Sequence, residues 1–270
     1  MAVVGLDTKG TATDTAIEVR QLHKWFRGNH VLRGLDLKVH TGTATAIVGS
    51  SGAGKSVLLK HMIGLARPTS GQIFILGREL TGKTGRDLEA LRRRFAMVFQ
   101  GSALLNSLTV GQNVGLGLTE QRRLSRKQID EIVGEKLALV GLRGKESLLP
   151  GELSGGMKKR VGIARALAMD PDIILFDEPT TGLDPVMAER IDALMIDLKN
   201  KLKKTMVVVS HDMDCAFKTV DYIAMIYEGK IVEQGTPEEF WRSTNPVVEQ
   251  FISRFKRQGE GKFFDKSLRL

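Results

Sequence analysis

The sequence has little cysteine and few aromatic residues. Cys215 is the one cysteine in 270 residues. A single cysteine excludes an internal disulfide and a cysteine-built metal site, and it is typical of a protein kept in a reducing compartment. Aromatic residues make up 6% of the chain, and the basic runs are not interleaved with them. We therefore expect no nucleic acid as a partner, because a reader of nucleic acid combines exposed aromatic and basic side chains.

Long hydrophobic runs are also missing. The longest uninterrupted ones, such as residues 173–176, are far shorter than a membrane-spanning helix. Residues 1–6 are apolar but lack a basic flank and are followed by Asp7, so they do not resemble a secretory signal. With 42% hydrophobic and 26% charged residues, the composition is that of an ordinary globular protein. The length allows one large α/β domain or two small ones.

The chain carries a formal net charge of +9. Its basic residues gather at 92–94, 122–123, 158–160, 199–204 and in the tail after Arg254. We expect most of these clusters to be solvated helix faces. An anionic membrane surface is the alternative, because it attracts basic residues over a short range. Charge alone leaves both interpretations open.

A glycine-rich segment identifies the first function. Gly49-Ser-Ser-Gly-Ala-Gly-Lys-Ser56 follows a short apolar run and opens a helix-compatible run. In this context successive backbone N–H groups and the helix N-terminus form a concave site for phosphate. The lysine adds a full charge, and the serine hydroxyl can complete a magnesium shell. The sequence predicts a nucleoside triphosphate site built from Gly49, Ser50, Ser51, Gly52, Ala53, Gly54, Lys55 and Ser56.

The rest of the chain alternates predicted strands and helices. Residues 1–15 are expected to form a loose arm, and 17–39 to form strands joined by a turn. Further strands are predicted at 72–76, 95–99, 173–177 and 206–210, and helices at 155–168 and from Asp184 to Lys199. Ser125 and Gln128 predict a capping box that starts a helix ending near Gly141. The pattern indicates an α/β core with a helical insert.

Five further elements follow the phosphate loop in a fixed order. They are Gln100 after a strand, the Leu153-Ser-Gly-Gly-Met157 segment, the pair Asp177-Glu178 at a strand end, Gly182-Leu-Asp184, and His211 after another strand. Together they resemble the ATP-binding-cassette (ABC) ATPases over residues 17 to about 245. The resemblance implies a P-loop NTPase core with an N-terminal antiparallel β subdomain. It places an ABC ATPase domain at 16–245, a helical insert at about 101–153, and a basic C-terminal tail at 246–270.

The resemblance also implies roles for these residues. Glu178 would be the general base for ATP hydrolysis, and His211 would contact the γ-phosphate. Mg²⁺ would be associated with Ser56, Gln100 and Asp177, and Gln100 would also sense the attacking water. Ser154, Gly155 and Gly156 would face the nucleotide bound by a second subunit, with Asp184 at the interface, so a homodimer is implied. Phe26 is favoured over Trp25 as the aromatic residue that stacks on adenine.

Finer features resemble the Mce/Mla-type ATPases, which energise lipid trafficking. These features are residues 99–110, the segment 153–160 with Met157 in place of the usual glutamine, and the block 178–185. Ser50 replaces a frequent proline, which the loop should tolerate. The implied partners are an integral membrane permease and a periplasmic Mce-domain lipid carrier, with the ATPase on the cytoplasmic side of the inner membrane. Two alternatives stay open: the ATPase of a small-solute importer, such as one for amino acids, and a non-transport ABC ATPase.

Overall fold

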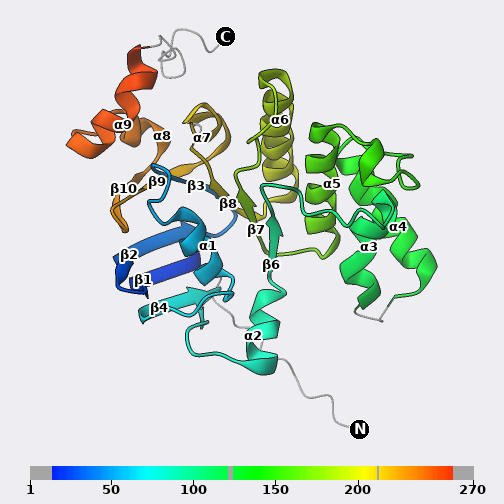
Figure 1. The fold of residues 1–270 in the computed structure, drawn as a ribbon, viewed down its shortest axis with the longest axis horizontal. Coiled ribbons are helices and arrows are strands. Elements are labelled where there is room, and N and C mark those ends of the chain that lie inside the picture. Colours follow the sequence, from blue (N-terminus) through cyan, green and yellow to red (C-terminus); the bar gives the residue numbers. More distant parts are fainter. Residues whose placement is uncertain (1–13, 121–123, 212, 258–270) are drawn as a thin grey trace.

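The structure is a computed structural model that describes residues 14–120, 124–211 and 213–257. Most of the expected loose arm at 1–15 lies outside these residues, as do Arg122, Arg123 and the last part of the predicted basic tail. Thr15, assigned to the arm from the sequence, is the first residue of strand β1. The order of the strands and helices along the chain can be followed in Figure 1.

A six-stranded sheet forms the centre of the fold. Its strand order is β10-β9-β3-β8-β7-β6, and all of its strands are parallel except β10 at one edge. The strands β3 and β8 are buried along their whole length, which explains why their sequences are apolar except for Thr45 and Thr205. The bounds are β3 Ala44–Val48, β6 Phe95–Val98, β7 Ile173–Asp177, β8 Thr205–Val209, β9 Tyr222–Tyr227 and β10 Lys230–Gly235.

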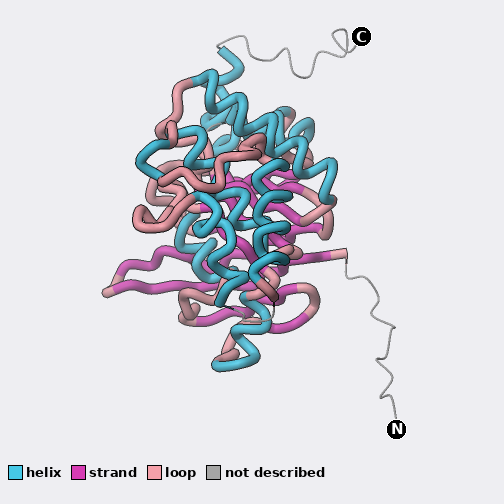
Figure 2. Tube along the Cα trace, turned by 90° about the vertical axis from the view of Figure 1, so that its right-hand side faces the viewer, coloured by secondary structure: helices cyan, strands magenta, loops and turns pink. Residues whose placement is uncertain are grey.

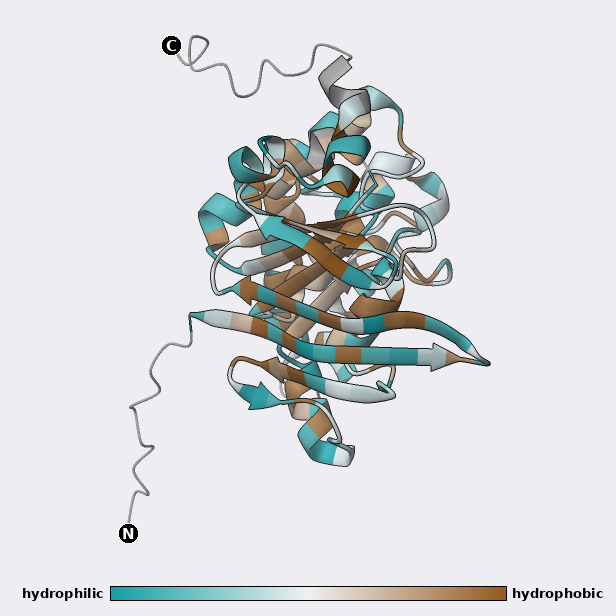
Figure 3. Ribbon diagram, turned by 90° about the vertical axis from the view of Figure 1, so that its left-hand side faces the viewer, coloured by the Kyte–Doolittle hydropathy of each residue, from teal (hydrophilic) through white to brown (hydrophobic). Residues whose placement is uncertain are grey.

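A second, antiparallel sheet comes from the N-terminal part of the chain. It consists of β1 (Thr15–Phe26), β2 (Asn29–His40), β4 (Ser70–Ile75) and β5 (Arg78–Glu79) in the order β2-β1-β4-β5. Apolar and polar residues alternate along the long strands β1 and β2, as Figure 3 shows, because one face of the sheet is buried. Helix α1 (Lys55–Met62) shares one apolar core with both sheets through Leu58, Leu59 and Met62.

Helix α2 joins the same core as α1 through Leu91, and the later helices cover the other face of the large sheet or its ends. Helices α3, α4 and α5 form a group beside β6, and Figure 2 shows helices on that side in front of the strands. Their apolar side chains join the second core, which also contains residues of α6, α7 and α9. The bounds are α2 Gly85–Arg92, α3 Val110–Glu120, α4 Arg126–Leu139, the 3₁₀ turn η1 Pro150–Glu152, α5 Gly155–Ala168, α6 Pro185–Leu202, α7 Met213–Thr219, α8 Pro237–Trp241 and α9 Pro246–Arg257.

Local sequence signals placed several of these elements well. Helix α5 has the predicted bounds, and α4 begins with the predicted capping box between Ser125 and Gln128. Helix α6 continues three residues beyond the predicted end at Lys199 and stops at Lys203, which has left-handed backbone dihedrals. The segment from Pro246, predicted as the start of a basic tail, forms α9 and buries Val248 and Ile252 in the core.

Candidate active site

One edge of the large sheet brings the predicted catalytic segments together. Val209 pairs with both Ile47 and Asp177, and Val98 pairs with Phe176, so the carboxyl ends of β3, β8, β7 and β6 lie in register. Neighbouring strands are about 4.8 Å apart. The phosphate loop, the acidic pair, His211 and Gln100 each follow one of these ends. Ligands of open parallel sheets bind at this edge.

The phosphate loop approaches the backbone of β9 so closely that only glycine fits at its start. A Cβ atom on Gly49, whose φ is 150°, would lie 2.3 Å from the carbonyl oxygen of Ile226. At the other end of the loop, Gly54 adopts a left-handed conformation as the N-cap of α1. The ammonium group of Lys55 donates to the carbonyl oxygens of Gly49 and Ser50, at 2.7 and 3.0 Å. The lysine thus closes the loop into a compact ring above the helix N-terminus.

Lys55 and the acidic pair share one electrostatic environment. Burial lowers the pKa of the Lys55 ammonium, while the charges of Glu178 and Asp177 act in the opposite direction. Burial also raises the pKa of the Asp177 carboxyl, and the neighbouring Glu178 carboxylate adds to that rise. Lys55 therefore places a positive charge where the acidic pair concentrates negative charge.

Glu178 is held in an unusual backbone conformation. Its φ is 51°, in the left-handed region that costs a residue with a side chain about 1–3 kcal/mol. Its N–H donates to the carbonyl of Val209 at 2.9 Å, which fixes the turn after β7. The carboxylate oxygen Oε2 accepts from the Thr181 hydroxyl at 2.9 Å and lies 2.5 Å from Nδ1 of His211. The side chain is therefore oriented by two neighbours from different loops.

Three residues predicted for Mg²⁺ offer oxygen ligands at this edge. Ser56 lies exposed in the first turn of α1, Asp177 ends β7, and Gln100 follows β6. Hard oxygen donors such as these suit Mg²⁺, which usually takes one or two protein ligands together with substrate phosphates. The raised pKa of Asp177 fits as well, because a bound cation would stabilise its charged form.

The segment Leu153–Met157, called the signature segment below, leads into α5 and packs against the start of α6. Ser154 is the N-cap of α5 and accepts from the N–H of Met157 at 3.3 Å. A Cβ atom on Gly156 would lie 2.0 Å from Cε of Met187, so a larger residue there would displace the end of the Met187 side chain. Asp184 caps α6 by accepting from the N–H of Met187 at 3.0 Å. Figure 1 shows α5 well separated from α1 and its phosphate loop.

The two adjacent aromatic residues at the end of β1 have different surroundings. Trp25 stacks on His30, with ring centroids 3.9 Å apart. The Phe26 ring instead lies 4.9 Å from the ammonium of Lys24, which also donates to the carbonyl of Arg67 just after α1. Lys24 pairs across the sheet with Leu32, the residue that would contact a Cβ atom on Gly54 at 3.0 Å. Trp25 is thus stacked on another ring, whereas the ring of Phe26 contacts a lysine side chain.

Basic residues expected to be solvated are partly used inside the fold. Arg92 donates to the carbonyl oxygens of Ile63 and Gly64 at the end of α1, and Arg94 forms an ion pair of 2.9 Å with Asp172. Lys159 is buried within the 158–160 cluster. The interpretation as a solvated face therefore holds for Arg93 and Arg94, which are exposed, but not for Lys159 or for the donor groups of Arg92. The sequence analysis also missed two contacts: the Thr181 hydroxyl donates to Glu178, and the Arg165 guanidinium donates to carbonyl oxygens of the loop after β6.

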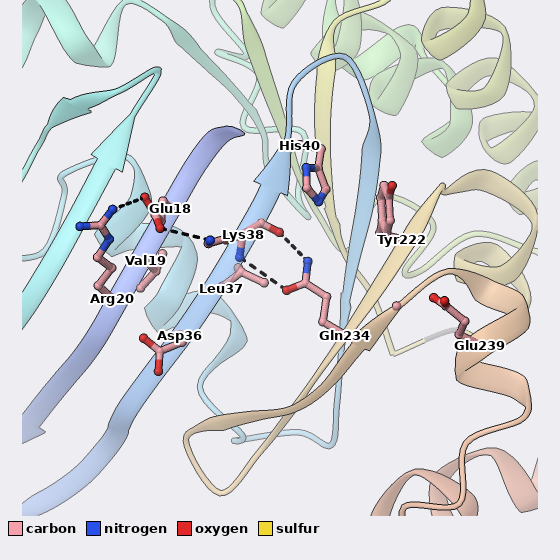
Figure 4. A pocket seen from close by; sticks show the side chains of 11 residues that line it. Glu18, Val19, Arg20, Asp36, Leu37, Lys38, His40, Tyr222, Gln234 and Glu239 are labelled. Carbon is pink, nitrogen blue, oxygen red and sulfur yellow. Dashed lines mark hydrogen bonds and ion pairs between the residues drawn. The ribbon is translucent and has the colours of Figure 1, made fainter. Parts of the chain in front are cut away.

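An open groove of about 600 Å³ lies elsewhere, between β2 and the β9–β10 pair. Figure 4 shows Gln234 reaching across it to the backbone of Lys38, with Glu18, Asp36 and Tyr222 around the rim. None of the predicted nucleotide-binding residues lines this groove. We therefore do not assign it to the nucleotide.

Comparison with known proteins agrees with this geometry. Residues 32–181 match the family described as ABC transporter, and this covers the phosphate loop, the signature segment and the acidic pair. The chain is 42% identical to the protein TRIGALACTOSYLDIACYLGLYCEROL 3, chloroplastic, of Arabidopsis thaliana, over 89% of this chain and 74% of that protein. It therefore belongs to the ABC transporter family, as an ATP-hydrolysing cassette of that family.

Relatives of different named function are similarly close. The intermembrane phospholipid transport system ATP-binding protein MlaF of Haemophilus influenzae is 40% identical over 87% of this chain and 89% of its own. The L-cystine import ATP-binding protein TcyN of Bacillus subtilis is 41% identical over 88% of this chain and 93% of its own. Sequence identity alone therefore does not decide whether the transported substrate is a lipid or an amino acid.

A solved structure shares the fold. The dimeric, post-hydrolysis ATP-binding cassette MJ0796 bound to ADP and Pi has a TM-score of 0.75 and 31% identity, over 82% of this chain and 98% of that one. This similarity confirms the predicted P-loop NTPase core with its antiparallel β subdomain and helical insert. Within the described part of this chain, none of the helices combines the length and apolar character of a membrane span.

Proposed function

We propose that this chain is the ATPase subunit of a transporter that moves phospholipid or another hydrophobic lipid between membranes of the cell envelope. The observation that carries the ATPase role is the meeting of Lys55, Asp177 and Glu178 at one sheet edge, where their charges influence one another. Similarity to MlaF supports the lipid class, as does Met157 at the signature position where a glutamine is usual.

In the proposed reaction, the chain's own groups bind the triphosphate and activate water. The N–H groups of the loop from Gly49 to Ser56 and the ammonium of Lys55 hold the phosphate oxygens. Ser56, Asp177 and Gln100 are the residues that would hold Mg²⁺, which neutralises charge on those oxygens when it is bound. Glu178 accepts the proton of the attacking water, and Thr181 and His211 orient its carboxylate. Phe26 stacks on adenine.

The second half of the site comes from another copy of the chain in this proposal. The N-terminus of α5, with Ser154, Gly155 and Gly156, faces the partner's nucleotide, and Asp184 lies at the interface. Two observations support this arrangement. Helix α5 is well separated from the chain's own phosphate loop, and the related cassette MJ0796 is dimeric.

The partners in the membrane follow from the same proposal. The cassettes dock on an integral membrane permease from the cytoplasmic side, and a periplasmic Mce-domain carrier receives or delivers the lipid. The segment after β6 is the proposed contact with the permease. Its side chains Phe99 and Leu105 are 40% and 46% exposed, which suits an apolar contact.

An amino-acid importer is the second candidate, because the chain is as similar to TcyN as to MlaF. The two candidates share the ATPase chemistry and differ in what the complex binds. Purification of the membrane complex through a tag on this chain, followed by mass spectrometry of extracted small molecules, separates them. We expect phospholipid at about one molecule or more per complex, above the amount in a mock purification. Retention of an amino acid without enriched lipid would favour the importer.

A further inference from the structure

One face of helix α5 holds the loop that follows β6. This loop, residues 100–103, contains two successive residues with left-handed backbone dihedrals, Ser102 with φ 60° and Ala103 with φ 46°. Such conformations are unfavourable for residues other than glycine and persist where neighbouring groups enforce them. The neighbouring groups here are on α5, at positions 159, 162 and 165, which lie on one side of the helix.

Arg165 and Gly162 hold the second half of the loop. The two terminal nitrogens of Arg165 donate to the carbonyl oxygens of Ser102 and Ala103, at 2.8 and 2.7 Å. A Cβ atom on Gly162 would lie 3.5 Å from Ser102, so helix and loop are in direct contact. Ser102 itself is buried. The planar guanidinium thus fixes two neighbouring peptide groups with one side chain.

Lys159 connects the first half of the loop to the catalytic glutamate. Its ammonium donates to the carbonyl oxygen of Gln100 and, at 3.4 Å, to that of Glu178. The side chain is buried, and burial lowers its pKa while the charges of Glu178 and Asp177 act in the opposite direction. Hydrogen bonds from a charged donor are stronger than neutral ones, so a single side chain ties together α5, the loop and the turn after β7.

We propose that Lys159 is a positioning residue for ATP hydrolysis, which holds the backbone of Gln100 and Glu178 in the geometry that the reaction requires. The backbone of Glu178 is then held on both sides of its Cα atom, by Val209 at its N–H and by Lys159 at its carbonyl. These two bonds fix the left-handed backbone conformation, from which the carboxylate takes its direction. The inference rests on the proposed role of Glu178 as the base. The run of three basic residues at 158–160 does not by itself indicate this function for Lys159.

The test compares Lys159→Met with Lys158→Met in the purified full-length chain. Both changes remove one lysine from adjacent positions of α5, but Lys158 is only partly buried and does not hold the loop in this structure. We expect Lys159→Met to lower kcat by about tenfold or more with KM for ATP changed less than about threefold, since positioning acts on the transition state. Lys158→Met should leave both values near those of the wild type.

Two further variants separate positioning from simple loss of structure. Lys159→Arg can still donate to both carbonyl groups, and we expect it to recover a large part of kcat. Lys159→Gln is shorter and uncharged, and we expect it to fall between Arg and Met. Equal kcat in the Met, Gln and wild-type chains would overturn the proposal. So would a kcat loss that merely follows a loss of folded protein in thermal unfolding.

Amide hydrogen exchange tests the contact without depending on catalysis. We expect faster exchange at residues 101–103 in Lys159→Met and in Arg165→Met than in Lys158→Met, because the hydrogen bonds that hold the loop are lost. Unchanged exchange in both variants would overturn the proposed hold on the loop. If exchange rises and kcat falls while Glu178→Gln retains turnover, the base assignment fails and the role of Lys159 in holding Gln100 stands.

Discussion

Nδ1 of His211 lies 2.5 Å from Oε2 of Glu178, so the loop after β8 and the loop after β7 meet through these two side chains. An ionised carboxylate only accepts hydrogen bonds, so with Glu178 ionised this contact requires the proton of the imidazole at Nδ1 of His211. In a neutral ring the other nitrogen, Nε2, then has a lone pair and cannot donate to phosphate. Donation to the γ-phosphate would require a second proton on the ring or a turn of the side chain when nucleotide binds.

The first prediction follows from this contact. His211→Ala should lower kcat by about 100-fold or more, because the carboxylate loses a donor that orients it. His211→Asn retains an N–H close to the position of Nδ1 and should keep more turnover than His211→Ala. Steady-state kinetics at saturating ATP measures both. Equal kcat in Asn and Ala variants would show that the contact with Glu178 does not matter for turnover.

The aromatic pair gives the second prediction. Phe26→Ala should weaken ATP binding by about 1–3 kcal/mol, the amount that base stacking contributes in comparable sites. Trp25→Ala serves as the matched control, because Trp25 stacks on His30 and should change affinity far less. Isothermal titration calorimetry of the two variants decides the assignment. A larger loss for Trp25→Ala would transfer the stacking role to Trp25.

The third prediction concerns Asp177 and the stability of the nucleotide-free chain. Its pKa is raised in the fold, mainly by burial and then by Glu178. A raised pKa favours the protonated form, so its stabilising contribution is complete below the unfolded-state pKa. That contribution is lost as pH rises through the folded pKa. The free energy of unfolding that Asp177 contributes is therefore smaller at pH 7 than in acid.

Asp177→Asn should accordingly raise the melting temperature at pH 7 without nucleotide, by about 2–4 °C for each kcal/mol gained in a domain of this size. The gain should shrink as the pH falls through the ordinary carboxyl range, because the wild-type carboxyl then binds its proton in both the folded and the unfolded chain. Asp197→Asn, at an exposed ion pair with Lys201, is the control and should change little. A lower melting temperature for Asp177→Asn at pH 7 would contradict the sign argued here.

Arg92 provides the fourth prediction. Arg92→Ala removes donors to two carbonyl groups at the end of α1 and should lower the free energy of unfolding by about 1–3 kcal/mol. Arg93→Ala, on the exposed neighbouring side chain, should change it by less than about 0.5 kcal/mol. Urea unfolding of both variants makes the comparison. Equal small changes would restore the interpretation of this cluster as a solvated face.

Much of the fold was predictable because its signals are local. The apolar run of β7, the caps of α4 and the bounds of α5 depend on residues close together in the chain. Strand β8 was predicted one residue too late, at 206 instead of Thr205, because the buried threonine reads as polar in the sequence. Apart from the phosphate loop, the catalytic edge was predictable only through the resemblance, since its four segments come from distant parts of the chain.

Lys159 shows what sequence reasoning left out and which signal was present. In the run Lys158-Lys159-Arg160 the charges alone do not tell which side chain faces inward. Gly162, Ile163 and Ala166 follow Lys159 at helical spacing and are all buried, so Lys159 lies on the inner face of α5. Its partners, the carbonyl groups of Gln100 and Glu178, are backbone atoms and leave no trace in the sequence pattern.

The most direct test of the account is single-turnover ATP hydrolysis by Glu178→Gln, with Glu189→Gln on the exposed side of α6 as the control. The amide keeps the size of the side chain but cannot accept the proton of water. We predict that Glu178→Gln binds ATP with a Kd within about threefold of the wild type and hydrolyses it at least about 100-fold more slowly. Glu189→Gln should behave as the wild type. Hydrolysis by Glu178→Gln at the wild-type rate would contradict the assignment of Glu178 as the base.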